Sequence, residues 1–276
     1  MKVGTRLGIL AGGGALPARV IAACRAAGRE FFVLAFEDQA DPDTVAGTPH
    51  AWVRLGAAGR AVELLRAAGV EELVMAGAVR RPSLAALRPD RQAARFLARL
   101  GPRLIGDNGL LRALAAVIER DEGFRIVGAD SVLADLVAPL GPFGRLRPGA
   151  EDARDIVCGV AAARRHGARD RGHAVVTRYG GVLDVEGADG TDALLERCRA
   201  RRGDAPGGVL VKVMKPRQDR RLDPPAIGPE TVRRAAAAGL RGIAVESGAV
   251  LVIDRDIVAR TADADGLFVV GVEVGA

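Results

Sequence analysis

The stretch RLGILAGGGALPARVIAACRAAGREFFVLAF, residues 6–36, decides how this chain begins to fold. A short apolar strand leads into a glycine cluster, then into a helix that ends near Gly28, and then into a second apolar strand. Pro17 suits the first turn of the helix, where a missing N–H costs nothing. The order of strand, glycine loop, helix and strand is typical of a parallel sheet with helices on its faces.

The same alternation continues to residue 136. The next predicted elements are a helix, a strand, two helices, and a strand with a short helix, at 59–68, 73–79, 91–100, 106–124 and 124–136. Because parallel strands are joined through covering helices, we predict an α/β protein whose residues 1–136 form a Rossmann-like domain.

A segment rich in proline and glycine follows, APLGPFGRLRPG at 138–149, and predicts a linker over residues 137–150. Residues 151–276 then predict a second, mixed α/β domain, with hairpin turns at Gly180-Gly181 and Ser247-Gly248. The helices of this domain are expected at 150–166, 191–202, 229–238 and 255–264, and its strands at 173–178, 182–186, 208–213, 242–246, 249–254 and 267–272.

The amino-acid composition limits the kinds of partner and the cellular compartment that we expect for this protein. The 276 residues include 40 basic and 34 acidic side chains without a long like-charge block, and only 3% are aromatic. We expect no nucleic-acid partner, because base-stacking aromatics and a basic stripe are missing. Anionic substrates or a membrane surface fit the net charge of +6 equally well. Widely spaced Cys24, Cys158 and Cys198, with no leader and no long apolar stretch, predict free thiols in a soluble, cytoplasmic protein.

Two loops of the first domain could face a ligand. Glycines such as Gly12, Gly13 and Gly14 let backbone N–H groups approach a phosphate at a helix N-terminus, but the spacing is neither GxGxxG nor a P-loop. A tight turn without a ligand stays open. Asp107 and Asn108 precede a strong helix, so they either cap it or hold a metal or a ligand hydroxyl.

The segment EGADGTD, residues 186–192, ends a strand and begins a helix. Thr191 is the expected helix cap, and three carboxylates in so short a segment suit Mg²⁺. An acidic turn that only caps the helix is the alternative.

The sharpest candidate is VLVKVMKPRQDRRLDPP at 209–225, which holds two of the three lysines in the chain, Lys212 and Lys215. Lysine contacts phosphate oxygen as a compact charge, whereas arginine favours planar pairing. Gln218, Asp219 and Asp223 follow in a loop stiffened by prolines. Cations beside carboxylates are what phosphoryl chemistry needs, and a solvated surface loop is the alternative. His50, His166 and His173 show no ligand or triad spacing, so we expect structural or exposed roles for them.

Five motifs in this order, LGILAGGGALP, GDNGLLRAL, EGADGTDALLERC, VLVKVMKPRQDRRLDPPAIGP and AGLRGIAVESG, closely resemble the LpxI type of UDP-2,3-diacylglucosamine pyrophosphatase over essentially the whole chain. The resemblance implies an enzyme of lipid A biosynthesis in Gram-negative bacteria. It would hydrolyse UDP-2,3-diacylglucosamine to UMP and 2,3-diacylglucosamine 1-phosphate, known as lipid X, with Mg²⁺ or another divalent metal. Water is expected to attack the phosphorus nearer the sugar. Peripheral contact with the inner membrane and a homodimer stay open.

The resemblance also assigns roles in the lysine loop. The family motif K-x-x-K-P-x-Q matches Lys212, Lys215 and Gln218, and the acidic residue before P-x-I-G matches Asp223. It implies that Asp223 binds Mg²⁺ or orients the attacking water, while the lysines neutralise the diphosphate.

The other motifs supply the substrate and metal contacts that the resemblance implies. Asp189, Gly190, Thr191 and Asp192 match an E-G-T-D type motif, with Asp189 in place of the more usual glutamate. Thr191 and Asp192 would hold phosphate, sugar or metal, and Asp189 would be a third metal ligand beside Asp192 and Asp223. The uridine nucleotide would lie near the glycine loop and Asp107-Asn108.

Two other classes compete with this interpretation. A nicotinamide-dependent oxidoreductase would use the β-glycine-α unit, although the fingerprint spacing is wrong. A non-catalytic lipid- or nucleotide-binding protein would leave the lysine and carboxylate loop without a catalytic role.

Overall fold

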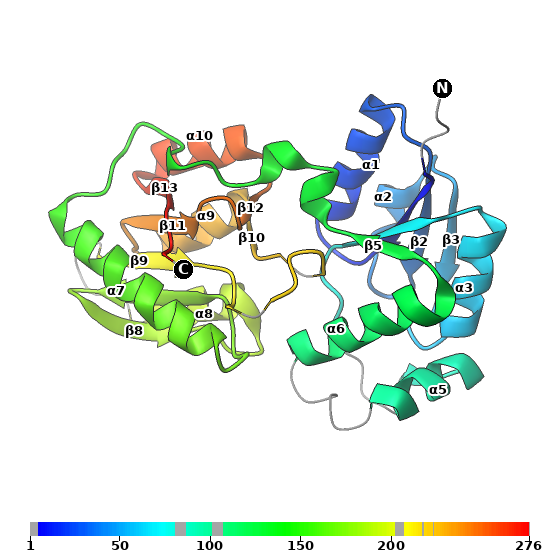
Figure 1. The fold of residues 1–276 in the computed structure, drawn as a ribbon. Coiled ribbons are helices and arrows are strands. Elements are labelled where there is room, and N and C mark those ends of the chain that lie inside the picture. The colour runs from blue at the N-terminus through cyan, green and yellow to red at the C-terminus, as the bar shows by residue number, and fades with distance from the viewer. Residues whose placement is uncertain are drawn as a thin grey trace. The chain divides into compact units, whose positions relative to one another are not determined.

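The computed structural model describes residues 5–80, 87–100, 107–201, 207–216, 218–222 and 224–275. The chain forms two compact units (Figure 1), and each is described by itself. The first unit comprises Met1–Ala134 with Asp219–Asp223, and the second comprises Asp135–Gln218 with Pro224–Ala276. The α/β class is confirmed, with a parallel sheet in the first unit and a mixed sheet in the second.

The first unit is built on a five-stranded sheet of order β3-β2-β1-β4-β5, in which every pairing is parallel. This is the strand order of a Rossmann fold. The strands are β1 Leu7–Ala11, β2 Phe31–Phe36, β3 His50–Val53, β4 Glu72–Ala76 and β5 Arg125–Val127. The sequence did not predict β3, because it is a short edge strand that begins with an exposed histidine.

Helices pack on this sheet through its apolar side chains. On one face Leu34, Leu73 and Ile126 lie in one buried cluster with Val62 and Leu65 of the third helix. The helices are α1 Leu16–Ala26, α2 Pro42–Val45, α3 Ala58–Ala67, α5 Arg91–Leu100 and α6 Asp107–Val117. The helix predicted to reach residue 124 passes instead into a π-helical turn at Ile118–Glu122, which ends at Gly123 in the left-handed conformation.

The second unit is built on a six-stranded sheet of order β6-β13-β11-β9-β7-β8. β9, β11 and β13 are parallel, whereas β6, β7 and β8 pair antiparallel. Its strands are β6 Gly141–Pro142, β7 Ala174–Arg178, β8 Gly181–Val185, β9 Val209–Lys212, β11 Gly242–Glu246 and β13 Phe268–Val272. The hairpin predicted at Gly180-Gly181 is confirmed by the pairing of β7 with β8.

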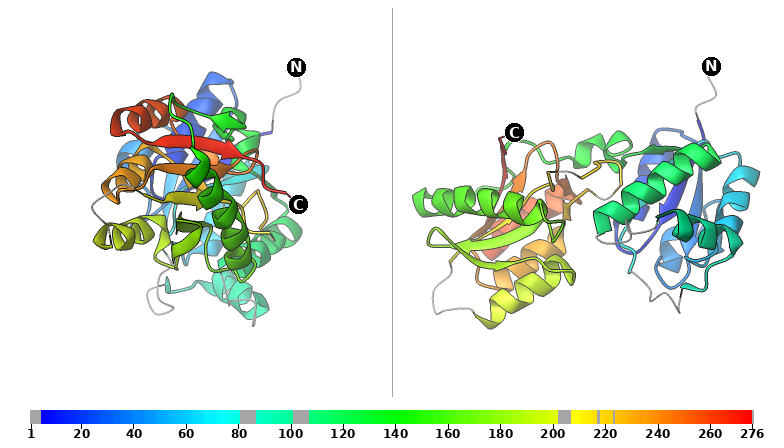
Figure 2. Two further views of the ribbon diagram at one scale, coloured as in Figure 1. Left: turned by 90° about the vertical axis from the view of Figure 1, so that its left-hand side faces the viewer. Right: turned by 60° about the horizontal axis from the view of Figure 1, so that its bottom comes forward.

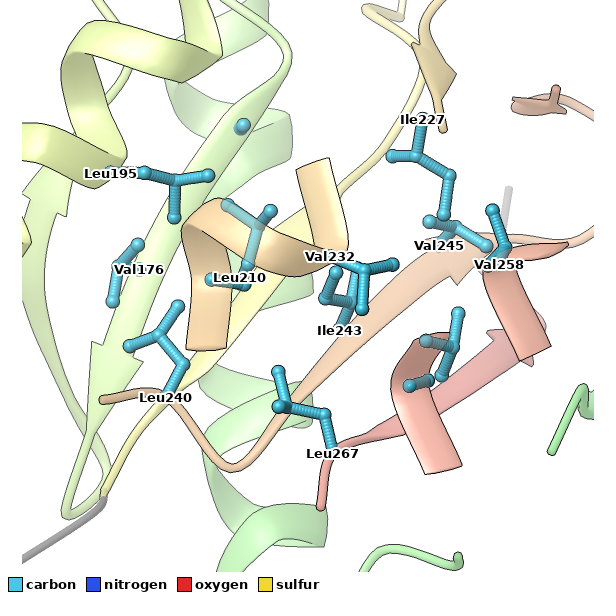
Figure 3. Packing of buried hydrophobic residues seen from close by; sticks show 14 of the residues in the cluster. Val176, Leu195, Leu210, Ile227, Val232, Leu240, Ile243, Val245, Val258 and Leu267 are labelled. Carbon is cyan, nitrogen blue, oxygen red and sulfur yellow. The ribbon is translucent and has the colours of Figure 1, made fainter. Parts of the chain in front are cut away.

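Helices lie on both faces of this sheet (Figure 2), and alternation along the central strands buries side chains on each face. Val175 and Val211 point to α7 (Ala150–Gly167), while Val176 and Leu210 point to the opposite face. Three helices cover that opposite face: α8 Gly190–Ala200, α9 Pro229–Ala237 and α10 Arg255–Asp265. Figure 3 shows Val176 and Leu210 packed with residues of these helices.

The hairpin predicted at Ser247-Gly248 is wrong. β12 (Leu251–Val252) pairs parallel with β10 (Ala226–Ile227) in a separate two-stranded sheet. The N–H groups of Ser247 and Gly248 donate to Val272 and Ala138, so this turn is bonded to other segments instead of closing a hairpin. Residues 249–252 are all buried and lack the alternation of a hairpin strand.

Cys24, Cys158 and Cys198 are all free thiols, as predicted. None of the helices in the described part of the chain has the length and apolarity to cross a membrane.

Candidate active site in the second unit

Lys212 is the last residue of β9, and the residue is 8% exposed. Nζ donates hydrogen bonds to Oγ1 of Thr191 over 2.8 Å and to the carbonyl of Ala226 over 2.9 Å. A buried ammonium is stable only when such partners replace water. The sheet therefore holds a cation at the carboxyl end of β9, next to the start of α8.

Glu186 lies behind this contact and is only 5% exposed. Its Oε1 accepts the hydroxyl proton of Thr191, and its Oε2 accepts the backbone N–H groups of His173 and Ala174. Burial by itself raises the pKa of Glu186, but the charge of Lys212 and these hydrogen bonds outweigh it and hold that pKa below its ordinary value. Glu186 is therefore a buried carboxylate.

His173 connects this cluster with the second lysine. Its Nε2 lies 2.8 Å from Oε1 of Gln218, and its Nδ1 lies 3.8 Å from Oε2 of Glu186. The N–H of Lys215 also donates to Oε1 of Gln218, over 3.3 Å. Nζ of Lys215, on a side chain that is 8% exposed, forms an ion pair with Asp170 at 2.8 Å. The predicted residues Lys212, Thr191, Lys215 and Gln218 thus belong to one network.

The predicted metal ligands of the acidic segment, Asp189 and Asp192, form ion pairs with arginines and are not part of this network. Asp189 forms an ion pair with Arg197, and Asp192 lies 3.6 Å from Arg234 with a side chain that is 62% exposed. No group of three possible metal-ligating side chains occurs among the residues that the structure describes. Asp223 lies outside those residues.

Thr191 does not cap its helix, which corrects the sequence prediction. α8 begins at Gly190, and Asp189 occupies the cap position without a side-chain hydrogen bond to the backbone N–H groups of the first turn. The hydroxyl of Thr191 instead joins Glu186 to Lys212.

The glycine loop of the first unit has a packing role. The N–H groups of Gly12 and Gly13 donate to the carbonyls of Ala76 and Ala78, each over 2.8 Å. A Cβ on Gly12 would lie 2.5 Å from the Ala78 oxygen. Both amides are thus bonded to backbone carbonyls, and the contact with residues 76–78 accounts for the glycine at position 12. Gly14 has a positive φ of 86°, which favours glycine for a different reason.

Asp107 and Asn108, the other predicted nucleotide contacts, lie in the first turn of α6, and their side chains lie outside what the structure describes.

The segment after Gln218 belongs to the first unit. Arg221 forms ion pairs with Asp219 at 2.8 Å and with Glu119 at 2.7 Å. The hydrogen bond from Arg221 is the main cause that holds the pKa of Asp219 below its ordinary value. Leu222 is 4% exposed within the core cluster of this unit. The second unit thus ends at Gln218 and resumes at Pro224. The contacts of Arg221 and Leu222 hold the intervening segment in the first unit.

Two family models match the chain in succession. The model described as the LpxI N-terminal domain matches residues 6–136, and the LpxI C-terminal domain matches residues 139–270. The chain belongs to the LpxI family. A curated relative, the UDP-2,3-diacylglucosamine pyrophosphatase LpxI of Caulobacter vibrioides, is 42% identical over 279 residues, which cover 97% of this chain and 98% of the relative. The resemblance inferred from the motifs is confirmed.

Solved structures add nothing to the LpxI assignment. An N5-carboxyaminoimidazole synthase from Aspergillus clavatus is 13% identical over 75% of this chain and 46% of its own, with a TM-score of 0.25. A biotin carboxylase domain from Hydrogenobacter thermophilus is 18% identical over 64% of this chain and 35% of its own, with a TM-score of 0.22. Neither likeness carries an argument about this chain.

Three members of the network in this LpxI chain were not among the site residues predicted from the sequence: Glu186, His173 and Asp170. Glu186 was counted only as one carboxylate of an acidic segment, and His173 was expected to be structural or exposed. The available signal was positional, since His173 adjoins a strand that lies next to β9 in the sheet. Neighbouring strands bring their ends together, but strand order was not readable from the sequence.

Proposed function

We propose that this LpxI chain hydrolyses the diphosphate of UDP-2,3-diacylglucosamine to UMP and lipid X, in lipid A biosynthesis. The observation that carries the proposal is the buried network that joins Lys212, Thr191 and Glu186 and continues through His173 and Gln218 to Lys215. Family membership and the named activity of the Caulobacter relative support it.

The proposed reaction balances as a simple hydrolysis. The oxygen of water forms a bond to the phosphorus nearer the sugar, and the bond from that phosphorus to the bridging oxygen breaks. UMP leaves with the bridging oxygen, the water oxygen remains in the phosphate of lipid X, and one proton is released. Lys212 and Lys215 would stabilise negative charge on the phosphate oxygens, and the low polarity around buried charges strengthens that effect.

Asp223 and a divalent metal complete the proposal. Asp189 and Asp192 form ion pairs with two different arginines, so these two carboxylates by themselves do not make a magnesium site. We assign Asp223 as a metal ligand because of its sequence motif, and phosphate oxygens of the substrate would be further ligands. When bound, Mg²⁺ would neutralise the diphosphate and favour ionisation of a bound water.

The decisive assay incubates the purified protein with UDP-2,3-diacylglucosamine, with and without added Mg²⁺, and measures UMP. We expect UMP to form with Mg²⁺, to stop with a chelator and to return when metal is restored. Asp223→Ala should abolish turnover, while Arg199→Ala, which removes an exposed ion pair on α8, should not change it. Turnover that persists in Asp223→Ala would remove the role assigned to Asp223.

Isotope labelling tests the point of attack. In water enriched in ¹⁸O, the label should enter the phosphate of lipid X and not UMP. Label in UMP would place the attack on the other phosphorus.

The same assay separates the competing classes. A non-catalytic binding protein would retain the substrate and form no UMP with any divalent metal. A nicotinamide-dependent oxidoreductase would likewise form no UMP and would bind a nicotinamide cofactor, which the glycine loop does not favour, since its Gly12 and Gly13 amides are bonded to backbone carbonyls. A cytoplasmic location, peripheral contact with the inner membrane and a homodimer stay predictions.

A further inference from the structure

Glu186 is a buried carboxylate for which the proposed reaction has no direct use. It contacts the hydroxyl of Thr191, not the ammonium of Lys212. The arrangement is therefore a relay in which Thr191 stands between the buried anion and the cation. What Glu186 contributes follows from the direction of each hydrogen bond.

A threonine hydroxyl has one proton to donate and two lone pairs that accept. Because Thr191 donates that proton to Glu186, its lone pairs are left for other donors. Nζ of Lys212 has only protons to donate, and it donates one of them to Oγ1 of Thr191 over 2.8 Å. The carboxylate thus sets the orientation of the hydroxyl that receives the ammonium.

The position of Glu186 is itself fixed from the other side. Its Oε2 accepts two consecutive backbone N–H groups, those of His173 and Ala174. Gly172 packs so closely that an added Cβ would lie 2.8 Å from the carbonyl oxygen of Glu186 and 2.9 Å from its Cβ. Gly172 also has a φ of 147°, which favours glycine. The carboxylate therefore has donors on both oxygens and little space in which to move.

We propose that Glu186 is a positioning residue that fixes the ammonium of Lys212 through the hydroxyl of Thr191. The catalytic consequence rests on the proposed function, in which Lys212 stabilises charge on the diphosphate. Glu186 also supplies the negative charge that offsets the burial of this cation.

Glutamine is the informative substitution at position 186 because it has nearly the same shape. An amide has one acceptor oxygen, whereas the native carboxylate accepts on both of its oxygens. If the amide oxygen faces the backbone N–H groups, its NH₂ faces Thr191 and the hydroxyl proton is turned toward Lys212. If the amide is flipped, its NH₂ opposes the two N–H groups. Glu186→Gln therefore breaks one side of the relay in either orientation.

The first measurement observes Lys212 without any need for turnover. The chain contains three lysines, so protein labelled with [¹⁵N]lysine gives at most three ammonium signals, which Lys212→Arg assigns. An ammonium held in hydrogen bonds exchanges its protons slowly enough to be detected. We expect the Lys212 signal in the wild type and in Thr191→Ser, which keeps the hydroxyl, and its loss in Glu186→Gln and Thr191→Val. A Lys212 signal that is unchanged in both folded variants would overturn the proposal.

The second measurement is kinetic. Misplacement of a catalytic group costs turnover more than binding, so kcat in Glu186→Gln should fall about 10- to 100-fold while KM changes little. The kcat of Thr191→Val should fall by a similar factor, whereas Thr191→Ser should keep most of the activity. The kcat of the double variant Glu186→Gln/Thr191→Val should be no lower than that of the slower single variant. Fully additive losses, or full activity in Glu186→Gln, would contradict the relay. If the wild type forms no UMP, the proposed function fails, and the ammonium signals still decide whether Glu186 fixes Lys212.

Discussion

Nζ of Lys212 donates a hydrogen bond to Oγ1 of Thr191 over 2.8 Å, and this contact joins the end of β9 to the first turn of α8. The two residues belong to separate sequence motifs, and the fold brings them into contact. The contact makes the lysine a directed donor in a buried setting instead of a solvated charge.

The ion pair of the buried Lys215 with the partly exposed Asp170 should stabilise the second unit. Asp170→Asn keeps a residue that tolerates the positive φ of 56° but removes the charge beside a buried ammonium. Because Asp170 is partly exposed, we expect a loss of about 1–3 kcal/mol in the free energy of unfolding, less than for a fully buried pair. Urea denaturation measures it. Glu196→Gln, in an exposed ion pair with Arg199, is the control, and an equal loss in both variants would contradict the assignment.

Glu186 should make stability depend on pH below its ordinary titration range. The folded state lowers the pKa of Glu186 from 4.5, so the unfolded chain binds the proton more readily. Its contribution is therefore present above pH 4.5 and lost as the pH falls through the folded-state value. The difference in melting temperature between wild type and Glu186→Gln should narrow from pH 7 to pH 3. A constant difference across this range would contradict the pKa shift.

Leu222 should anchor the loop segment in the first unit. It is 4% exposed in the same cluster as Leu73 and Ile126, so Leu222→Ala should cost about 2–5 kcal/mol. Hydrogen exchange should show faster opening of the amides of β4 and β5, while those of β9 and β11 keep their rates. Loss of protection only in the second unit would show that the segment packs elsewhere.

Gly12 should be required for packing. Gly12→Ala would place a methyl group 2.5 Å from the carbonyl oxygen of Ala78, so we expect a loss of about 1–3 kcal/mol. Gly181→Ala is the matched control, since its added Cβ would lie 3.7 Å from the nearest atom, the oxygen of Arg178. Thermal unfolding compares the two, and an unchanged melting temperature in Gly12→Ala would contradict the packing role.

The sequence predicted most of the fold because its elements have strong local signals. Periodic apolar residues marked the helices at 150–166 and 229–238, and the structure places them at Ala150–Gly167 and Pro229–Ala237. The short edge strand β3 and the pairing of β12 were missed, since neither has a local signal of its own. β12 follows a turn whose amides are bonded to distant segments, which no local pattern reveals.

The sequence predicted those residues of the candidate site that belong to a motif. It did not predict the residues that only the order of strands in the sheet brings to the site. Lys212 and Lys215 stood out because arginine is used almost everywhere else in the chain. His173 and Glu186 join them only because β7 lies between β8 and β9 in the sheet. The sequence also suggested a phosphate-facing role for the glycine loop, although the amides of Gly12 and Gly13 donate to backbone carbonyls.

The most direct test of the central claim is UMP formation from UDP-2,3-diacylglucosamine by Lys212→Met. The variant keeps an unbranched side chain of similar length without the ammonium. Loss of a charge-stabilising donor costs about 10²- to 10³-fold in kcat, so we predict a fall of that size with an unchanged far-UV circular dichroism spectrum. A folded Lys212→Met protein that releases UMP at the wild-type rate would contradict the claim that the buried lysine network performs the hydrolysis.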